Sequence, residues 1–197
     1  HPFDPTAGSM QDFALEVAGV GGDSQFVKFD SRTRWYYPFY RNPKFGTFTA
    51  STGWTFGYGF GYGDQRELPL FERYFPGGIN SIRGFAVRSL GPRVPVYSQG
   101  RQDSGACPYN DQQCAFFVRY DVIGGSTQLV FNNEVIFPLV EALGLKGVIF
   151  FDAGEAYSAA DGIDITDFRT AAGFGVRWLS PIGPLRIEIG FPLNPRV

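Results

Sequence analysis

Three charged residues are spaced so that their side chains can act together. Arg83 lies in the segment Ile82-Arg83-Gly84-Phe85, and two carboxylates, Glu134 and Asp152, follow it farther along the chain. Each carboxylate falls in a segment of alternating apolar and polar residues, on the polar side. A guanidinium group presents a planar fork of donors that suits carboxylates. The pattern predicts that Arg83 is held by Glu134 and Asp152.

The neighbours of Arg83 suit a loop that folds back onto a wall formed by the segments that carry Glu134 and Asp152. Gly84 lets the backbone approach the wall closely or adopt a positive φ, and Phe85 can pack on apolar residues. A surface turn with an exposed arginine is the simpler interpretation, but the matching carboxylates disfavour it. Paired carboxylates also serve acid/base catalysis. No nucleophile or substrate pocket accompanies Glu134 and Asp152, so we expect no enzyme activity.

Other residue types exclude several kinds of site. His1 is the only histidine, so histidine-based metal sites and Ser-His or Cys-His catalysis are not expected, and neither is a cofactor. Cys107 and Cys114 stand seven positions apart and predict a short disulfide loop in an oxidising compartment; two free thiols are the alternative. A net charge of -2 argues against a nucleic-acid partner.

The elements that position these residues are strands. Glycine and aromatic residues are abundant and only 18% of residues are charged, which favours an all-β chain. We treat residues 1–197 as one domain. The sequence contains no run of 18 apolar residues, so no membrane-spanning helix is predicted. Seven segments alternate apolar and polar residues and are predicted to be antiparallel strands: about Asp12–Ala18, Val27–Tyr37, Phe45–Phe60, Thr127–Phe137, Leu145–Tyr157, Phe168–Trp178 and Leu185–Phe191.

The second of these strands decides between two architectures. Its apolar side carries Val27, Phe29, Trp35 and Tyr37, and its other side carries four successive charges, Lys28, Asp30, Arg32 and Arg34. In a soluble two-sheet protein the charged side faces solvent and the aromatic side needs a second sheet. In a membrane barrel the aromatic side faces lipid and the charged side lines a wet lumen. The same sidedness in all seven strands predicts a transmembrane β-barrel with solvated charges inside.

The connections alternate in length, as in outer-membrane barrels. Pro38–Lys44 and Glu141–Gly144 are short, whereas the connection from about Gly63 to Gly125 is long and carries Ile82–Phe85. We expect this connection to be an irregular loop inside the lumen. Because an unpaired edge is costly in lipid and strand numbers are usually even, seven strands predict an incomplete barrel.

The chain resembles the outer-membrane barrel-assembly superfamily of the BamA-type insertases. Ile82-Arg83-Gly84-Phe85 resembles the loop signature of that family. Four further segments match it in the expected order: Tyr74-Phe75-Pro76-Gly77-Gly78, Gly91-Pro92, Phe150-Phe151-Asp152-Ala153-Gly154 and Gly173–Leu185. In the family, acidic residues at the positions of Glu134 and Asp152 hold the loop arginine.

The resemblance implies a 16-stranded barrel preceded by periplasmic POTRA domains, of which this chain is the C-terminal part without POTRA domains or the last strand. It implies a Gram-negative outer-membrane location and a function in folding and inserting β-barrel proteins. The implied partners are outer-membrane lipids, unfolded β-barrel clients and, for the full-length protein, periplasmic lipoproteins of an assembly complex.

Other functions fit the same sequence. A two-partner-secretion pore and a TamA-like assembly factor belong to the same superfamily, and the features that separate them lie upstream of this chain. A passive diffusion barrel is disfavoured by the loop signature, whereas a barrel that anchors an N-terminal enzyme domain stays open. The client range, the oligomeric state and whether 197 residues close a barrel are not fixed by these residues.

Overall fold

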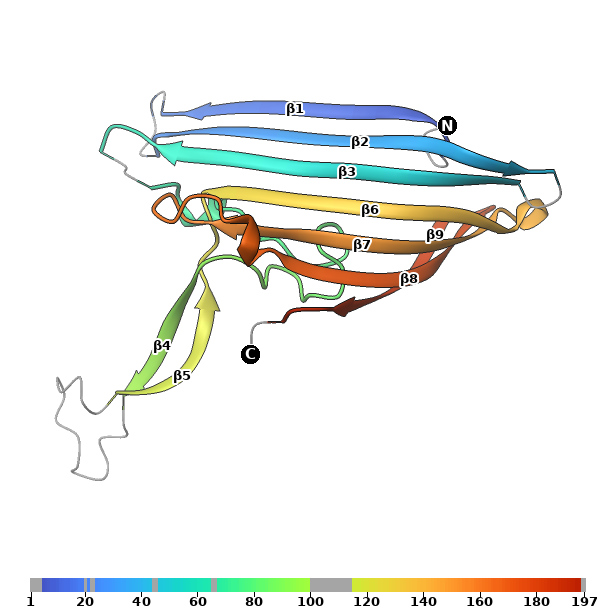
Figure 1. The fold of residues 1–197 in the computed structure, drawn as a ribbon. Helices are drawn as coiled ribbons and strands as arrows, with labels where there is room; N and C mark the ends of the chain where they lie inside the picture. The colour runs from blue at the N-terminus through green and yellow to red at the C-terminus, as the bar shows by residue number, and fades with distance from the viewer. Residues whose placement is uncertain are drawn as a thin grey trace.

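A computed structural model describes residues 5–19, 21, 24–43, 46–64, 67–99 and 115–195. Its main element is one antiparallel sheet of seven strands in the order β1-β2-β3-β6-β7-β8-β9 (Figure 1). The strands are β1 Gly8–Ala18, β2 Phe26–Asn42, β3 Gly46–Gly61, β6 Thr127–Val140, β7 Leu145–Tyr157, β8 Arg169–Ser180 and β9 Gly183–Pro192. The prediction of seven antiparallel strands in an all-β chain is confirmed.

The two faces of the sheet differ as the alternation predicts. The outer face carries large apolar side chains that none of the described residues covers: Phe174 is 55% exposed and Ile187 77%. Neighbouring aromatic residues pair along this face, as Trp35 and Trp54 do at 4.6 Å between ring centroids. A continuous apolar face of this kind marks contact with another apolar phase. The inner face is rich in glycine and charged residues, which leaves room for the long connection.

The seven strands of this sheet have 10 to 17 residues. About 9 to 11 residues suffice for a tilted strand to cross a bilayer, so β2 and β3 extend beyond it. The prediction that Pro38–Lys44 is a turn was wrong in part, because β2 continues to Asn42 through a register shift between Pro38 and Tyr40. A proline has no N–H for the ladder, and a bulge accommodates it without ending the strand.

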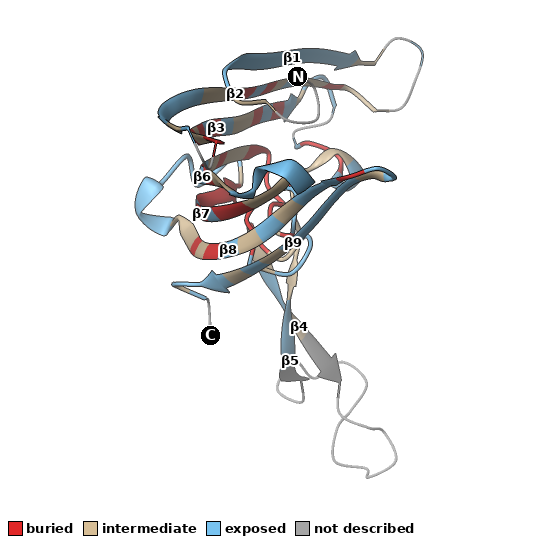
Figure 2. Cartoon of the chain, turned by 90° about the vertical axis from the view of Figure 1, so that its right-hand side faces the viewer, coloured by how far each residue is buried: buried red, intermediate tan, exposed pale blue. Residues whose placement is uncertain are grey.

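The sheet is curved, and the loop lies in its concave side. Figure 2 shows the strands following an arc from β1 to β9, with buried residues on β6 and β7 next to the loop. In the described residues β1 and β9 are the edges, so the sheet is open. The apolar cluster lies between loop and sheet: Ile82 and Leu90 come from the loop, Val130 and Ala171 from β6 and β8.

The connection between β3 and β6 is not wholly irregular, and this expectation was wrong. It contains the 3₁₀ turn η1 (Leu70–Glu72) and a hairpin of β4 (Arg93–Gln99) and β5 (Ala115–Val122). The hairpin points away from the sheet (Figure 1). Pro95 lies within β4, where the sequence disfavours a strand, but a two-stranded ribbon has free edges that tolerate proline.

Two further 3₁₀ turns lie in the described part of the chain. Between β6 and β7, η4 (Glu141–Leu143) ends at Gly144, which adopts φ 66°. Between β7 and β8, η5 (Ile165–Asp167) is capped by Asp164, whose side chain accepts a hydrogen bond from the N–H of Thr166. Within the described ranges, no helix is long and apolar enough to cross a membrane.

Candidate functional site

The segment Ile82-Arg83-Gly84-Phe85 lies on the inner face of the sheet, at the end of a tight turn. The N–H of Ser81 donates to the carbonyl of Gly78 at 3.1 Å, and the N–H of Gly78 donates to the carbonyl of Ile82 at 3.2 Å. Gly78 adopts φ 95°, a conformation that glycine reaches without strain. The turn directs Ile82 and Arg83 toward the sheet.

Apolar contacts fix the backbone of this segment. Ile82 is fully buried and packs with Leu90, Val130 and Ala171. Phe85 is half-buried and packs against the same cluster. Removing an isoleucine side chain from water contributes about 1.5 to 3 kcal/mol, so this cluster alone favours a docked loop.

Gly84 brings the loop backbone directly onto β9. It adopts φ 90°, and a Cβ atom at this position would lie 3.0 Å from the carbonyl carbon of Gly190. A Cβ atom on Gly190 would lie 2.6 Å from the nitrogen of Gly84. Both positions therefore need glycine, because any other residue would push the loop off the strand.

Arg83 binds Asp152 of β7 through three hydrogen bonds. Its Nε donates to Oδ2 at 2.7 Å, its Nη2 donates to Oδ1 at 2.7 Å, and its backbone N–H donates to Oδ2 at 3.0 Å. The guanidinium group lies over the ring of Phe150, 3.6 Å from its centroid. Gly173 on β8 leaves space for that ring. The bidentate pair and the ring together set both the position and the plane of the guanidinium group.

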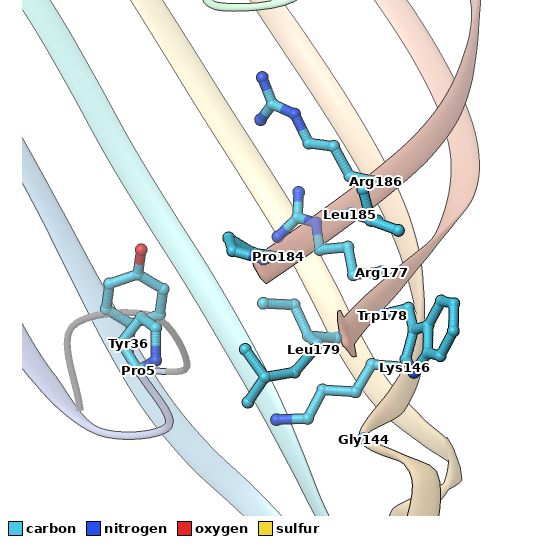
Figure 3. A pocket seen from close by; sticks show the side chains of 11 residues that line it. Pro5, Tyr36, Gly144, Lys146, Arg177, Trp178, Leu179, Pro184, Leu185 and Arg186 are labelled. Atoms are coloured by element: carbon cyan, nitrogen blue, oxygen red, sulfur yellow. The ribbon is translucent and has the colours of Figure 1, made fainter. Parts of the chain in front are cut away.

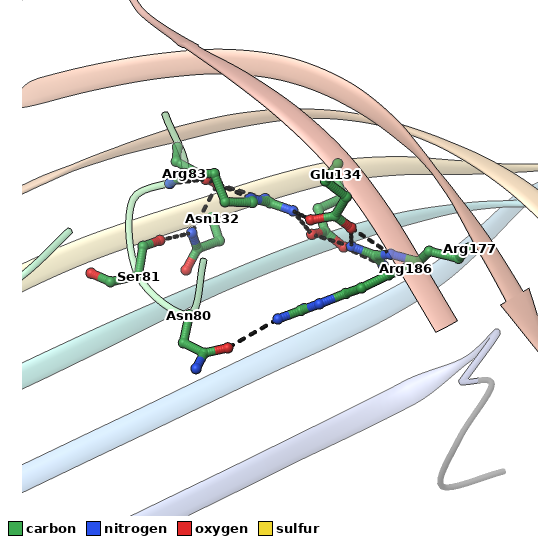
Figure 4. A network of polar contacts seen from close by, with 9 residues as sticks. Asn80, Ser81, Arg83, Asn132, Glu134, Arg177 and Arg186 are labelled. Atoms are coloured by element: carbon green, nitrogen blue, oxygen red, sulfur yellow. Dashed lines mark hydrogen bonds and ion pairs between the residues drawn. The ribbon is translucent and has the colours of Figure 1, made fainter. Parts of the chain in front are cut away.

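The same guanidinium group belongs to a ring of alternating charges (Figure 4). Arg83 Nη1 binds Glu134 of β6 at 2.6 Å and Glu188 of β9 at 3.1 Å. Arg177 of β8 closes the ring, at 2.8 Å from Glu134 and 2.6 Å from Glu188. The structure thus brings both predicted carboxylates to Arg83 and adds Glu188 and Arg177, two charged residues that the sequence did not connect with Arg83.

Asn132 is a further residue that the sequence did not single out. It is the direct cross-strand partner of Asp152, whereas Glu134 lies diagonally, opposite Phe150. Its Nδ2 donates to Asp152 Oδ1 at 2.8 Å and to the carbonyl of Ser81 at 2.7 Å. Asn132 therefore links the wall carboxylate to the loop backbone. The alternation that placed Glu134 inward also placed Asn132 inward, but an amide carries no charge signal.

The carboxylates around Arg83 keep its guanidinium group ionised although it is buried. Asp152 is fully buried, Glu134 is 5% exposed and Arg83 is 7% exposed. Burial disfavours the charged guanidinium group, but the hydrogen bonds and negative charge of Asp152, with the charge of Glu134, raise the pKa of Arg83 above its ordinary value. Breaking a buried pair by removing one partner costs about 3 to 5 kcal/mol. The loop is therefore bound by ion pairs that each depend on the others.

Two pockets lined by basic residues lie beside the ring of charges formed by Arg83, Glu134, Glu188 and Arg177. One of about 410 Å³ lies near the β8–β9 turn, with Lys146, Arg177 and Arg186 directed toward it (Figure 3). The other, of about 420 Å³, lies between the loop and β2 and is lined in part by Arg32 and Arg34. Both are open rather than enclosed, which agrees with a hydrated inner face.

The arrangement suits holding the loop in position against the sheet. Every charged group of the network is bound to another, and none is paired with a nucleophile. No group of three or more His, Cys, Asp and Glu side chains in the described part of the chain is arranged for a metal ion. Cys107 and Cys114 lie outside the described residues, so their disulfide stays a prediction.

Comparison with known proteins places this geometry in a family. Residues 1–196 match the Omp85 superfamily domain. The outer membrane protein assembly factor BamA of Neisseria meningitidis is 27% identical over 219 aligned positions, covering 98% of this chain and 24% of that protein. The factor of the same name from Nitratidesulfovibrio vulgaris is 32% identical over 193 positions, covering 96% of this chain and 21% of that protein.

A solved structure shows the same fold. The crystal structure of BamA from Haemophilus ducreyi lacking POTRA domains 1–3 superimposes with a TM-score of 0.77 at 25% identity, covering 98% of this chain and 36% of that chain. The chain spans less than a quarter of the length of the two curated relatives. From the family match over nearly all its length and the shared BamA-like barrel fold, the chain belongs to the Omp85 superfamily.

Proposed function

We propose that this chain is the barrel wall and lumenal loop of a factor that folds β-barrel proteins into the Gram-negative outer membrane. The observation that carries the proposal is the loop bound to the inner wall by Arg83, Asp152, Glu134 and Glu188 in an Omp85 sheet. The relatives that the chain matches are named outer membrane protein assembly factors, which supports the same function.

The physical work of such a factor needs no cofactor. A client's edge strand pairs with an exposed strand edge of the barrel through main-chain hydrogen bonds. The outer apolar face of the sheet meets the lipid, and the loop holds the inner face. We propose that Arg83 and its carboxylates position the loop and take no part in catalysis, and that this part of the protein has no enzyme activity.

We propose unfolded β-barrel proteins and outer-membrane lipids as the partners. In the full-length protein we propose POTRA domains and periplasmic lipoproteins of an assembly complex. Strand pairing depends on backbone hydrogen bonds and on the alternation of side chains rather than on one particular sequence. The client range is therefore expected to be broad.

The test is replacement of the full-length protein in its native cell. The chromosomal copy is depleted while wild type or Arg83→Ala is supplied, and every outer-membrane barrel protein is quantified by mass spectrometry. We expect depletion to lower unrelated barrel proteins together, and Arg83→Ala to restore them incompletely. If barrel levels hold while one secreted protein accumulates in the periplasm, the protein is a secretion pore and the proposal is wrong.

A further inference from the structure

The loop touches the sheet at a second place, on strands other than those that Arg83 binds. Arg83 binds residues of β6, β7 and β9, whereas the outgoing leg of the loop, residues 68–74, lies against β2 and β3. Lys28 of β2 binds Glu72 of η1 at 3.1 Å from Nζ to Oε2. Lys28 was expected to be a solvated lumen charge like Arg32, but only 16% of its side chain is exposed. The expectation was wrong for this residue.

Two glycines on the inner face of β3 form a groove for the same leg. A Cβ atom at Gly57 would lie 2.5 Å from the ring of Tyr74, and one at Gly59 would lie 3.0 Å from Leu68. Tyr74 and Leu68 fill this space and are 6% and 2% exposed. Burial of a leucine and a tyrosine in a groove that only glycine leaves open indicates a shaped docking position.

The charge of Lys28 is directed to the loop rather than along the sheet. Glu16 of β1 is its direct cross-strand partner, yet in the described residues the ion pair of Lys28 is with Glu72. The Nζ atom also lies 4.9 Å from the centroid of the Tyr74 ring. Lys28 therefore contacts both a charged and an aromatic residue of the same leg.

The base of the loop is closed at this point. The N–H of Tyr74 donates to the carbonyl of Gly125 at 2.8 Å, and the N–H of Gly125 donates back at 2.9 Å. The outgoing and returning legs are thus joined where the leg sits on β3. These hydrogen bonds do not involve Arg83 or its carboxylates.

We propose that Lys28, Glu72 and Tyr74, seated over Gly57 and Gly59, form a second anchor that positions the base of the loop independently of Arg83. The two anchors lie on different strands, with the base of the loop on β2 and β3 and Arg83 on β6, β7 and β9. Release of the loop tip, Ile82–Phe85, leaves the base of the loop, residues 68–74, and the β4–β5 hairpin in place. The tip can therefore detach and bind again at the same position. The consequence for client insertion rests on the proposed function; the anchor itself does not.

Two backbone amides report on the two anchors separately. The amide of Tyr74 is bonded to Gly125, and the amide of Arg83 is bonded to Asp152. Hydrogen exchange of both is measured by mass spectrometry in the full-length protein in lipid nanodiscs. We expect Lys28→Met to speed exchange at Tyr74 about tenfold, since it removes the ion pair and the cation from the ring while keeping the apolar stem. Exchange at Arg83 should change less than twofold.

Matched variants separate anchoring from general stability. Lys28→Arg keeps the charge, so the Tyr74 amide should exchange at the wild-type rate. Glu16→Gln changes the cross-strand neighbour of Lys28 and should also leave exchange at Tyr74 unchanged. The swap Lys28→Glu with Glu72→Lys should recover most of the loss, with client insertion rates following the same order. Equal acceleration at Tyr74 and Arg83 would show one cooperative unit and overturn the proposal, as would no acceleration at Tyr74. Exchange does not require insertion activity, so failure of the proposed function would leave this result readable.

Discussion

Replacement of Arg83 by alanine tests whether the charge network holds the loop tip. In the full-length protein, Cys107 and Cys114 are replaced and Ile82→Cys is introduced as the only thiol of this segment. Position 82 is fully buried against the sheet, so a thiol reagent reaches it only when the tip opens. The labelling rate then measures the opening equilibrium.

The size of the effect follows from what Arg83→Ala leaves behind. Glu134 and Glu188 keep Arg177, at 2.8 and 2.6 Å, so neither becomes an unpaired charge. Asp152 loses its bidentate partner but keeps two donors, the Nδ2 of Asn132 at 2.8 Å and the backbone N–H of residue 83 at 3.0 Å. One carboxylate that loses its charge partner but keeps two donors places the cost near the lower end for a broken buried pair, about 3 kcal/mol. We expect labelling to quicken about 100-fold, since each 1.4 kcal/mol is tenfold.

Two companion variants check the reasoning. Glu134→Gln leaves Arg83 with Asp152 and Glu188, so labelling should quicken only about fivefold, in line with about 1 kcal/mol for one hydrogen bond. Arg83→Ala with Asp152→Ala leaves no orphaned charge, so its effect should fall short of the sum of the singles by about 2 kcal/mol. A change below threefold for Arg83→Ala, or strict additivity in the double variant, would refute the view that this ion pair holds the tip.

Further predictions concern the backbone contact, the lipid face and the hairpin. Gly190→Ala should speed labelling at position 82 at least tenfold, because a Cβ atom there meets the loop backbone at 2.6 Å. Ile149→Arg on the outer face should destabilise folding into lipid vesicles by about 2 to 4 kcal/mol, whereas Thr55→Arg on the inner face should cost less than about 1 kcal/mol; urea titration followed by tryptophan fluorescence measures both. Cys107 and Cys114 should resist thiol alkylation until a reductant is added, which mass spectrometry of the tryptic peptides detects.

Local patterns accounted for the strands and for the direction of their side chains. A strand repeats every two residues, so the sidedness of β6 and β7 can be read from any few neighbours. That reading put Glu134 and Asp152 on the inner face, where the structure has them. The end of β2 was misplaced because Pro38 looks like a turn signal, and only pairing with β3 carries the strand past it.

Other parts of the site depended on which strands lie across from one another. Glu188 and Arg177 face inward in the sequence pattern, but their nearness to Arg83 comes from the curvature that brings β9 toward the loop. The ion pair of Lys28 with Glu72, 44 residues apart, likewise depends on where the loop crosses the inner face of the sheet. No short-range pattern encodes these distances.

Short-range patterns were enough to predict the seven strands of the main sheet, the apolar outer face, the polar inner face and a charged loop motif, because each depends on residues close together in the chain. Only the folded sheet shows that Glu188 and Arg177 join Arg83, that Gly84 and Gly190 must both lack a side chain, and that the loop rests on the sheet at two places. The physical reason is that ion pairs and close backbone contacts act over a few ångströms, and only the folded, curved sheet sets those distances.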